Sequence, residues 1–441
     1  MEKILNLIKK ATPSYIFEFF QPIYHYLMAL SAAVFYGFPS RKMIVIGVIG
    51  TKGKTTTCNL IAQILNFSGH KTGMATTVNF RIGNKEWKNE TKQTMLGRFK
   101  LQKLLRQMVD EECEYAVVET SSEGILQYRH RFIDYDVAVF TNLSPEHIER
   151  HGGFENYRNA KVKLFEKVVR KKNGIGIYNL DDENVGYFLK PDIKNKYGYG
   201  IKFLTSHAYR QAGNFQFPKK LKISNISLFP DKTEFEFNNE NFRMSLIGEF
   251  NVYNAAAAIC AALSQGISIA KIKTALIKAR APFGRMEIIK SKDFNIIVDY
   301  AHEPASLEAV YKTIKNSGLM NKNSKMICLL GAQGGGRDKW KRPEMGKIAD
   351  QYCDKIILTN EDPYDENPSQ ILSDIKSGIK KSENLYEIVD RKEAIKKALS
   401  LAKSGDAVVL TGKGGESSMC VENNKKIPWN ESEIVKVLLN K

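Results

Sequence analysis

The fold of this chain is decided by the stretch Gly47-Val48-Ile49-Gly50-Thr51-Lys52-Gly53-Lys54-Thr55-Thr56. Immediately before it, Met43 to Gly47 is a short β-branched apolar run, which is typical of a buried strand. After the glycine-rich turn, Lys54 to Phe67 has the apolar periodicity of a helix. Strand, glycine-rich turn and helix together predict the opening unit of a parallel α/β sheet.

The same stretch carries the parts of a phosphate-binding loop. Its glycines let backbone N–H groups close around phosphate oxygens, and the N-terminus of the following helix adds its positive dipole end. Lys54 can reach the β- and γ-phosphates, and Thr55 can ligate Mg²⁺. The spacing is not that of the standard Walker motif, because the position five before Gly53 is Val48. The loop predicts nucleoside-triphosphate binding and leaves the reaction open.

Outward from the loop, the pattern predicts a mostly parallel central sheet domain. Buried strands follow at Tyr115 to Glu119, Val137 to Thr141 and Gly174 to Asn179. Leu221 to Met244 alternates apolar and polar residues, which favours a β-rich segment, and Asn251 to Leu263 is an Ala-rich helical stretch.

A second α/β unit is predicted from about Pro282 to the C-terminus. Short apolar runs there each end in a turn containing Gly or Asp, with helical patterns between them. This favours a Rossmann-like open sheet with ligands at the carboxyl ends of its strands. The expected organisation is an apolar helical segment (1–40), a central nucleotide-binding domain (41–281) and a C-terminal domain (282–441). The runs are Ile296 to Asp299, Met326 to Leu330, Lys355 to Leu358 and Ala407 to Leu410.

The composition narrows the classes of ligand and partner that the protein is expected to bind. The 66 Lys and Arg residues outnumber the 48 Asp and Glu residues, and the net charge of +18 suits an anionic ligand or surface. The basic residues are dispersed, without a basic arm or an aromatic-basic pattern, so no nucleic-acid partner is expected. A monomer is the simplest expectation. The six cysteines are widely spaced and predict buried free thiols in a reducing cytoplasm: Cys58, Cys113, Cys260, Cys328, Cys353 and Cys420.

The N-terminal segment differs in composition from the rest of the chain. Ile23 to Phe38 is almost wholly apolar, but its 16 residues fall short of the ~20 that a spanning helix needs. Pro22, Glu18 and Gln21 also count against a clean span. We expect a helix that is docked on the protein or lies at a membrane interface, which makes contact with a membrane surface a second option for localisation.

Further polar motifs follow the predicted strands. Glu119-Thr120-Ser121-Ser122 places a carboxylate at a strand end, where it can ligate Mg²⁺ together with a phosphate. The run from Thr141 to Gly152 contains His147, His151 and two acids within six residues, which favours a metal or phosphate site. Lys161 lies on the next predicted helix and, from its spacing alone, is an ordinary surface lysine.

These motifs, in this order, resemble those of the Mur ligases of peptidoglycan synthesis, and most closely the synthetases that add the third residue of the stem peptide. The resemblance runs from about Ile44 to Glu416. Besides the segments above, it includes Asn159-Ala160-Lys161, Gly248-Glu249-Phe250-Asn251-Val252-Tyr253-Asn254, Gly284-Arg285-Met286-Glu287, Asp299-Tyr300-Ala301-His302, Arg337-Asp338-Lys339 to Arg342-Pro343 and Gly412-Lys413-Gly414-Gly415-Glu416.

The resemblance implies ATP, Mg²⁺ and a set of roles. Lys54 and Thr55 hold the phosphates and the metal, with Glu119 and His147 as further metal ligands, and Lys161 matches a lysine that becomes carbamylated. The remaining nucleotide contacts implied are the loop residues Gly50, Thr51, Lys52, Gly53 and Thr56, then Asn251 and Asn254 at the adenine, and Arg285 and Asp299 from the C-terminal domain.

The implied substrates are a muramyl-peptide acceptor and a free amino acid. Arg129, in Gln127-Tyr128-Arg129, matches an arginine that faces the acceptor, and Arg337 and Glu416 match residues that hold the amino acid. The acceptor carboxylate attacks the γ-phosphate to give an acyl phosphate, which the amine then attacks. The other implied substrate residues are Ser121, Gln127, His302, Glu361, Asp362 and Gly412.

Two departures from the family pattern affect the substrates. Only about forty residues precede the first strand, where the family has a uridine-binding domain, so we expect an acceptor held without its uridine, held by a separate protein, or borne by a membrane. The diaminopimelate-selecting Asp-Asn-Pro-Arg signature aligns with Glu361-Asp362-Pro363-Tyr364, and tyrosine cannot make arginine's bidentate contact. Lysine or another amino acid therefore stays open.

Two alternative functions remain. One is a related ligase with another acceptor, similar to folylpolyglutamate or cyanophycin synthetases. The other is a non-catalytic subunit that binds a partner through its apolar N-terminal segment. Thr55-Thr56, the Glu119 run and Asp299-Tyr300-Ala301-His302 favour the Mur side, and the intact Lys54 and Lys161 argue for an enzyme.

Overall fold

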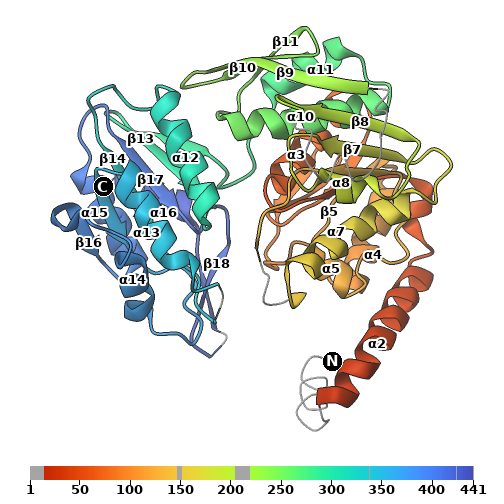
Figure 1. Ribbon diagram of the computed structural model, residues 1–441, viewed down its shortest axis with the longest axis horizontal. Helices are drawn as coiled ribbons and strands as arrows, with labels where there is room; N and C mark the ends of the chain where they lie inside the picture. The colour runs from red at the N-terminus through yellow and green to blue at the C-terminus, as the bar shows by residue number, and fades with distance from the viewer. Residues whose placement is uncertain (1–13, 147–150, 204–218, 337, 424, 441) are drawn as a thin grey trace.

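The chain forms two α/β units that lie side by side (Figure 1). The computed structural model describes residues 14–146, 151–203, 219–336, 338–423 and 425–440. The central unit runs from β1 to α11, and the C-terminal unit runs from β12 to α16. The predicted boundary at residue 281 falls between α11 and β12.

The central unit is built on an eleven-stranded sheet in the order β11-β10-β9-β8-β7-β6-β1-β5-β2-β3-β4. The strands from β9 through β1 to β2 are parallel, and antiparallel strands extend both edges. The strands are β1 (Ile44–Ile49), β2 (Thr72–Ala75), β3 (Asn79–Ile82), β4 (Lys85–Lys88), β5 (Tyr115–Glu119), β6 (Val137–Phe140), β7 (Ile175–Asn179), β8 (Asn195–Gly200), β9 (Lys219–Leu228), β10 (Thr233–Phe237) and β11 (Glu240–Met244).

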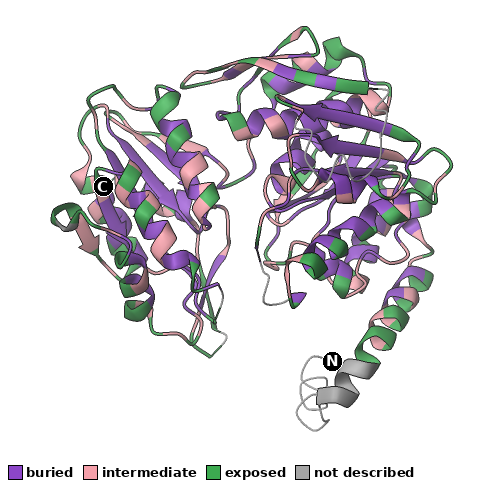
Figure 2. Cartoon of the chain, viewed as in Figure 1, coloured by how far each residue is buried: buried purple, intermediate pink, exposed green. Residues whose placement is uncertain are grey.

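Helices cover both faces of this sheet, so its parallel strands are buried on both sides (Figure 2). β1 lies between β5 and β6, and its residues from Val45 to Ile49 are all buried, which explains the unbroken apolar run in the sequence. One face carries α3 (Lys54–Phe67), α10 (Glu249–Ser264) and α11 (Ile269–Lys278); the other carries α4 (Arg98–Asp110), α5 (Ser122–Leu126), α7 (Phe154–Val168) and α8 (Val185–Leu189).

The C-terminal unit is a six-stranded sheet in the order β12-β13-β17-β14-β15-β16, parallel except for β12. Its strands are β12 (Glu287–Lys290), β13 (Asn295–Asp299), β14 (Met326–Leu330), β15 (Lys355–Leu358), β16 (Leu385–Glu387) and β17 (Ala407–Thr411), with a separate hairpin of β18 (Ser418–Val421) and β19 (Lys425–Pro428). The helices are α12 (Pro304–Asn316), α13 (Lys341–Tyr352), α14 (Pro368–Lys376), α15 (Arg391–Leu401), α16 (Glu431–Leu439) and the 3₁₀ turn Ser382–Asn384.

The predicted fold class is confirmed, and most predicted elements lie within two residues of the observed ones. α3, β5, β14 and β15 have the predicted bounds. The alternating segment from Leu221 to Met244 forms β9, β10 and β11. These strands continue the central sheet, because β9 pairs with β8 in parallel.

Within the described part of the N-terminal segment, the chain forms the helix α2 (Ser14–Phe35), followed by the 3₁₀ turn Pro39–Lys42. α2 packs against α4 through its small residues Ala29, Ala32 and Ala33, and its far end projects away from the central unit (Figure 1). Among the described helices, none combines the length and apolar character needed to cross a membrane.

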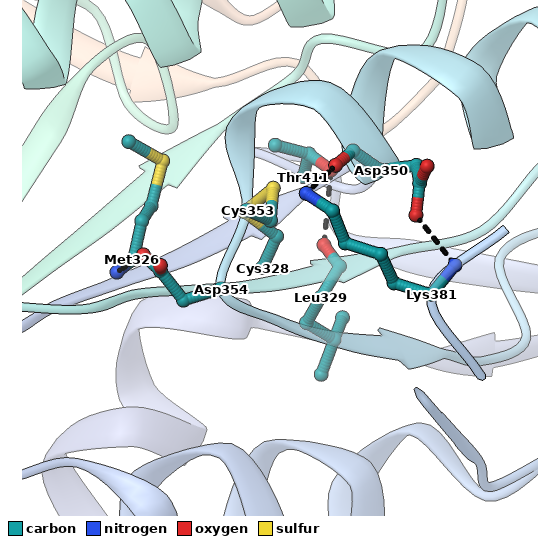
Figure 3. The surroundings of a disulfide bond; sticks show 8 residues. All are labelled: Met326, Cys328, Leu329, Asp350, Cys353, Asp354, Lys381 and Thr411. Carbon is teal, nitrogen blue, oxygen red and sulfur yellow. Dashed lines mark hydrogen bonds between the residues drawn. A yellow bond between two sulfur atoms is a disulfide. The ribbon is translucent and has the colours of Figure 1, made fainter. Parts of the chain in front are cut away.

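The prediction of six free thiols is wrong for one pair. Cys328 in β14 and Cys353, which follows α13, form a disulfide, with their Cα atoms 6.0 Å apart (Figure 3). The two residues are 25 positions apart in sequence and meet only because α13 returns the chain to the strand beside β14. The remaining four cysteines are free and buried, as predicted: Cys58, Cys113, Cys260 and Cys420.

Candidate active site

A cavity of about 780 Å³ lies between the two units, at the carboxyl ends of β1, β5 and β6. Its wall brings together most of the residues predicted from the sequence, although they come from loops far apart in the chain. The predicted residues on the wall are Thr51, Lys52, Gly53, Lys54, Thr55, Thr56, Glu119, Ser121, Arg129, Lys161, Asn251, Asn254, Arg285, Asp299, His302, Asp362 and Glu416.

The phosphate loop is fastened to the loop that follows β6. The backbone N–H of Thr51 donates to the Asn142 carbonyl (2.8 Å), and that of Lys52 donates to the Asn142 side-chain oxygen (2.8 Å). A Cβ on Gly50 would lie 1.9 Å from the Thr141 hydroxyl. Gly53 has φ +80°, and a Cβ there would lie 2.2 Å from the Asn254 side chain. The two glycines are therefore required by close packing and by backbone conformation.

A buried carboxylate faces the start of α3. The Thr55 hydroxyl donates to Glu119 (2.9 Å), while Thr77 donates to the same carboxylate through its backbone N–H (2.8 Å) and its hydroxyl (2.9 Å). Lys54 lies beside them, and burial lowers its pKa although Glu119 and Glu146 act against that shift. Hydroxyl and carboxylate oxygens at a helix N-terminus fit Mg²⁺ bound together with phosphate oxygens.

Lys161 is buried against the back of the phosphate loop. Its ammonium nitrogen donates to the Gly50 carbonyl and lies 4.4 Å from the centre of the Tyr157 ring. Burial, followed by the nearby charge of Lys54, lowers the pKa of Lys161 well below its ordinary value. Residue 161 is therefore not the surface lysine that its spacing suggested, and its amine has an unusually high neutral fraction.

A second polar cluster joins the two units. Glu146 accepts from Lys52 (3.0 Å), and its carboxylate lies 3.8 Å from the imidazole of His302. Glu303 accepts from the buried Lys341 and lies 3.9 Å from the same imidazole. Burial, then Lys52 and Lys341, lowers the pKa of His302 well below its ordinary value. Ligand atoms of Glu146, His302 and Glu303 lie within 4.8 Å of one another.

The predicted adenine end is formed by α10 and by the loops around β13. Asn254 donates to Asn251 (3.0 Å), which orients both amides. The Arg285 guanidinium stacks on Tyr300, 4.1 Å from the ring centre. Asp299 accepts from the backbone of Met286 and Ala301, each at 2.7 Å. Burial raises the pKa of Asp299, while Arg285 opposes that shift. Polar side chains thus line the cavity beside the phosphate loop.

Arg129, the arginine predicted to face the acceptor, lies on the cavity wall. Its guanidinium is held by the Gln127 side-chain oxygen (2.7 and 3.1 Å) and by the Met95 carbonyl. Gln127 itself lies behind the wall. Ser121 caps α5 by accepting from the Gly124 N–H (3.0 Å). The Arg129 cation is therefore held in a fixed position on the cavity wall.

A further part of the cavity wall is acidic and comes from the C-terminal unit. Asp362 accepts from Lys413 (2.8 Å), and Glu416 accepts from the same ammonium group. Burial raises the pKa of Asp362, but Lys413 and Lys92 outweigh that effect, and the pKa lies below its ordinary value. Lys92, from the central unit, contacts both carboxylates.

Some predicted residues are not on the wall. Gly50 packs against the loop after β6, and Gly412 packs against Glu361, which is itself fully buried. His147 and Arg337 lie outside the described residues. Four residues of this region were not predicted from the sequence: Thr77, Lys92, Glu303 and Lys413. The first two have no motif around them, whereas Glu303 and Lys413 adjoin residues that were singled out.

Comparison with known proteins matches both units to one family. Residues 48–262 match the family model described as Mur ligase middle domain, and residues 284–414 match the one described as Mur ligase, glutamate ligase domain. The chain is 37% identical to UDP-N-acetylmuramoyl-L-alanyl-D-glutamate--2,6-diaminopimelate ligase 1 of Clostridium acetobutylicum, over 92% of this chain and 80% of that protein.

Two further comparisons agree. UDP-N-acetylmuramyl-tripeptide synthetase of Roseiflexus sp. is 33% identical, over 92% of this chain and 80% of that protein. A solved structure of a UDP-N-acetylmuramoyl-L-alanyl-D-glutamate--2,6-diaminopimelate ligase superposes with a TM-score of 0.61 at 30% identity, covering 90% of this chain and 78% of that one. The chain therefore belongs to the Mur ligase family.

Proposed function

We propose that this chain is an ATP-dependent ligase that joins an amino acid to the carboxylate of a muramyl-peptide acceptor. One observation carries the proposal: a single cavity contains the phosphate loop, the acceptor-end Arg129 and the acidic wall of Asp362 and Glu416. A ligase that passes through an acyl phosphate needs ATP, a carboxylate and an amine within reach of one another. The named relatives act on UDP-muramoyl peptides, which supports the choice of acceptor.

The chain's own residues fit the two steps of this reaction. In the first step the acceptor carboxylate attacks the γ-phosphate, ADP leaves, and Lys54 at the start of α3 offsets the charge that develops on the phosphate oxygens. Thr55 and Glu119 fit Mg²⁺, which would offset further phosphate charge. In the second step the amine attacks the acyl carbon, loses a proton and expels phosphate. Arg129 provides a cation for the acceptor end throughout.

We propose further that Lys161 reacts with carbon dioxide to form a carbamate. Only a neutral amine is nucleophilic toward carbon dioxide, and burial lowers the pKa of Lys161 in that direction. The product would place an anion near Lys54 and Glu119, at the side of the phosphate loop. Supplying ¹³C-bicarbonate should give a carbamate carbon resonance in the wild type that is lost in Lys161→Met. A wild-type spectrum without that resonance would contradict the carbamate.

Helix α2 supports a proposed contact with a membrane surface. Several of its large apolar side chains are exposed, including Ile23, Leu27 and Phe35, at 50%, 54% and 73%. The helix also adjoins the acceptor end, since His25 contacts Arg98, whose guanidinium donates to the Gln127 carbonyl. We expect the full chain to sediment with anionic phospholipid vesicles and the Ile23→Glu/Leu27→Glu variant to stay in the supernatant, with equal turnover of a soluble acceptor. Equal sedimentation of both proteins would argue against this contact.

The reaction itself is tested by measuring phosphate release with ATP, a panel of amino acids and either a UDP-linked muramyl dipeptide or the same muramyl dipeptide without uridine. Product mass should increase by one amino-acid residue. Lys54→Met serves as the inactive control. Turnover with a folate or with a cyanophycin primer, and none with muramyl peptides, would favour the related ligases. Absence of amino-acid-dependent phosphate release with every acceptor would rule out the enzyme.

A further inference from the structure

One lysine of the central unit reaches into the acidic wall of the C-terminal unit. Lys92 lies in the loop between β4 and α4, and its ammonium nitrogen is 3.1 Å from Asp362 and 3.3 Å from Glu416. The three side chains are only 11%, 2% and 15% exposed, so these ion pairs are shielded from water. The backbone of Lys92 has φ +55°, a conformation uncommon for a residue with a side chain. The loop is therefore shaped to present this cation.

The charges of this wall are balanced when Lys92 is in place. Lys413, which is fully buried, donates to Asp362, to Glu416 and to the Ser418 carbonyl (2.9 Å). Two ammonium groups thus face two carboxylates. Glu361 lies beneath them and keeps its proton more readily than a carboxyl group in water, because burial and the charge of Asp362 raise its pKa to about 7.

Two other cations close to Glu361 are already paired. Lys341 donates to Glu303, and Arg391 forms a bidentate pair with Glu431 in which both side chains are fully buried. Neither cation is available to exchange with Lys92.

We propose that Lys92 is a specificity-determining residue, which occupies the Asp362–Glu416 pair so that the cavity accepts an amino acid with a neutral side chain and rejects one with a second ammonium group. The inference rests on the proposed ligase function and concerns only which amine it takes. Lys92 and the acids lie on the wall of the same cavity as the phosphate loop.

The physical reason is the free-energy cost of placing a third cation beside two carboxylates that already face two ammonium groups. A second ammonium group on the substrate would have to enter beside Lys92 and Lys413, where little water screens it, or displace Lys92 from both carboxylates. Displacement would leave the Lys92 ammonium in a nearly dry space without its partners. A neutral side chain incurs neither cost. Tyr364, on the same wall, carries no charge to receive the second carboxylate of a diamino diacid.

The wild-type enzyme is assayed first, with a fixed muramyl-peptide acceptor and ATP. The kcat/KM for glycine, L-alanine and L-serine is compared with that for L-lysine, L-ornithine and meso-diaminopimelate, by phosphate release and product mass. We expect the best neutral amino acid to exceed the best diamino acid by at least about tenfold, the size of effect that one buried charge pair gives.

Three variants then separate the effect of the Lys92 charge from the effects of side-chain length and of removing any lysine in this region. Lys92→Met keeps the length of the side chain and should raise kcat/KM for the diamino acids by about tenfold or more, while KM for ATP stays within about twofold. Lys92→Arg keeps the cation and should keep the wild-type order of substrates. Lys85→Met removes an exposed lysine of the adjoining β4 and is the matched control, with no expected change of order.

The results that would contradict the role of Lys92 can be told apart from those that would contradict the ligase function. Wild-type turnover of lysine or diaminopimelate as fast as of neutral amino acids overturns the role of Lys92 and leaves the ligase intact. An equal fall for all amino acids in Lys92→Met, with the wild-type order kept, means that Lys92 only bridges the two units, which also overturns it. If Lys92→Met does not fold, Lys92→Gln and the wild-type panel decide. No phosphate release by the wild type with any amino acid contradicts the proposed function itself.

Discussion

Replacing Glu361 by glutamine should stabilise the protein at alkaline pH. The side chain is 0% exposed, and within the described part of the chain both of its carboxylate oxygens lack a hydrogen-bond partner. Burial, then the charge of Asp362, raises its pKa to about 7, although Lys413, Lys341 and Arg391 act in the opposite direction. In the unfolded chain the pKa returns to its ordinary value of 4.5.

The sign follows from the proton count. Between pH 4.5 and 7 the folded protein keeps the Glu361 proton while the unfolded chain loses it, so the free energy of unfolding falls as pH rises. A difference of about 2.5 pKa units corresponds to about 3 kcal/mol above pH 7. Glu361→Gln carries no proton to lose. It should therefore gain about 3 kcal/mol over the wild type at pH 8 and less than about 1 kcal/mol at pH 5.

Urea unfolding of both proteins at pH 5 and pH 8 measures this difference. The comparison across pH cancels any constant effect of the glutamine amide on packing. Glu366→Gln is a contrasting control: Glu366 is held by Arg342, which lowers the pKa of Glu366 to about 2, so its removal should destabilise the protein at both pH values. A Glu361→Gln gain that is the same at pH 5 and pH 8, or no gain at pH 8, would refute the reasoning.

Three further perturbations test other parts of the structure. Lys54→Met should lower kcat for phosphate release by about 10²-fold or more, because it removes the loop's charge on the phosphates, and nucleotide binding measured by fluorescence should survive. Arg391→Met should cost about 3–5 kcal/mol in urea unfolding, because it leaves the fully buried Glu431 without its partner; unchanged stability would contradict that. Loss of the Cys328–Cys353 bond in the double alanine variant should cost about 3 kcal/mol for its 25-residue separation, measured the same way against the disulfide-bonded wild type.

Much of the fold could be predicted because its signals are local. Parallel strands buried on both faces are continuous apolar runs, so β5, β14 and β15 have the predicted bounds. α3 likewise starts at Lys54, where the glycine turn ends. What could not be predicted was how the segments pair. The join between β8 and β9, which adds the β-rich segment to the central sheet, depends on register across distant residues that leaves no local pattern.

The nucleotide half of the site was largely predictable for the same reason. The phosphate loop, Glu119 and the β6 loop are motifs at strand ends, and the strand order β6-β1-β5 brings those ends to one edge. Thr77 was missed because it holds Glu119 from a different strand connection, through contacts that no short motif encodes. The burial of Lys161 could be inferred only from the family resemblance, since its helical spacing alone indicates a surface residue.

The amine half of the site was the least predictable, and the reason is physical. The net charge of this part of the site depends on residues from both units. Lys92 of the central unit forms ion pairs with Asp362 and Glu416 of the C-terminal unit. Read singly, each is a common surface residue type. A motif aligned within the C-terminal unit alone would count two carboxylates and predict a site for a cationic side chain. The added lysine reverses that prediction, because with Lys92 present the cluster has no net negative charge with which to attract a second ammonium group.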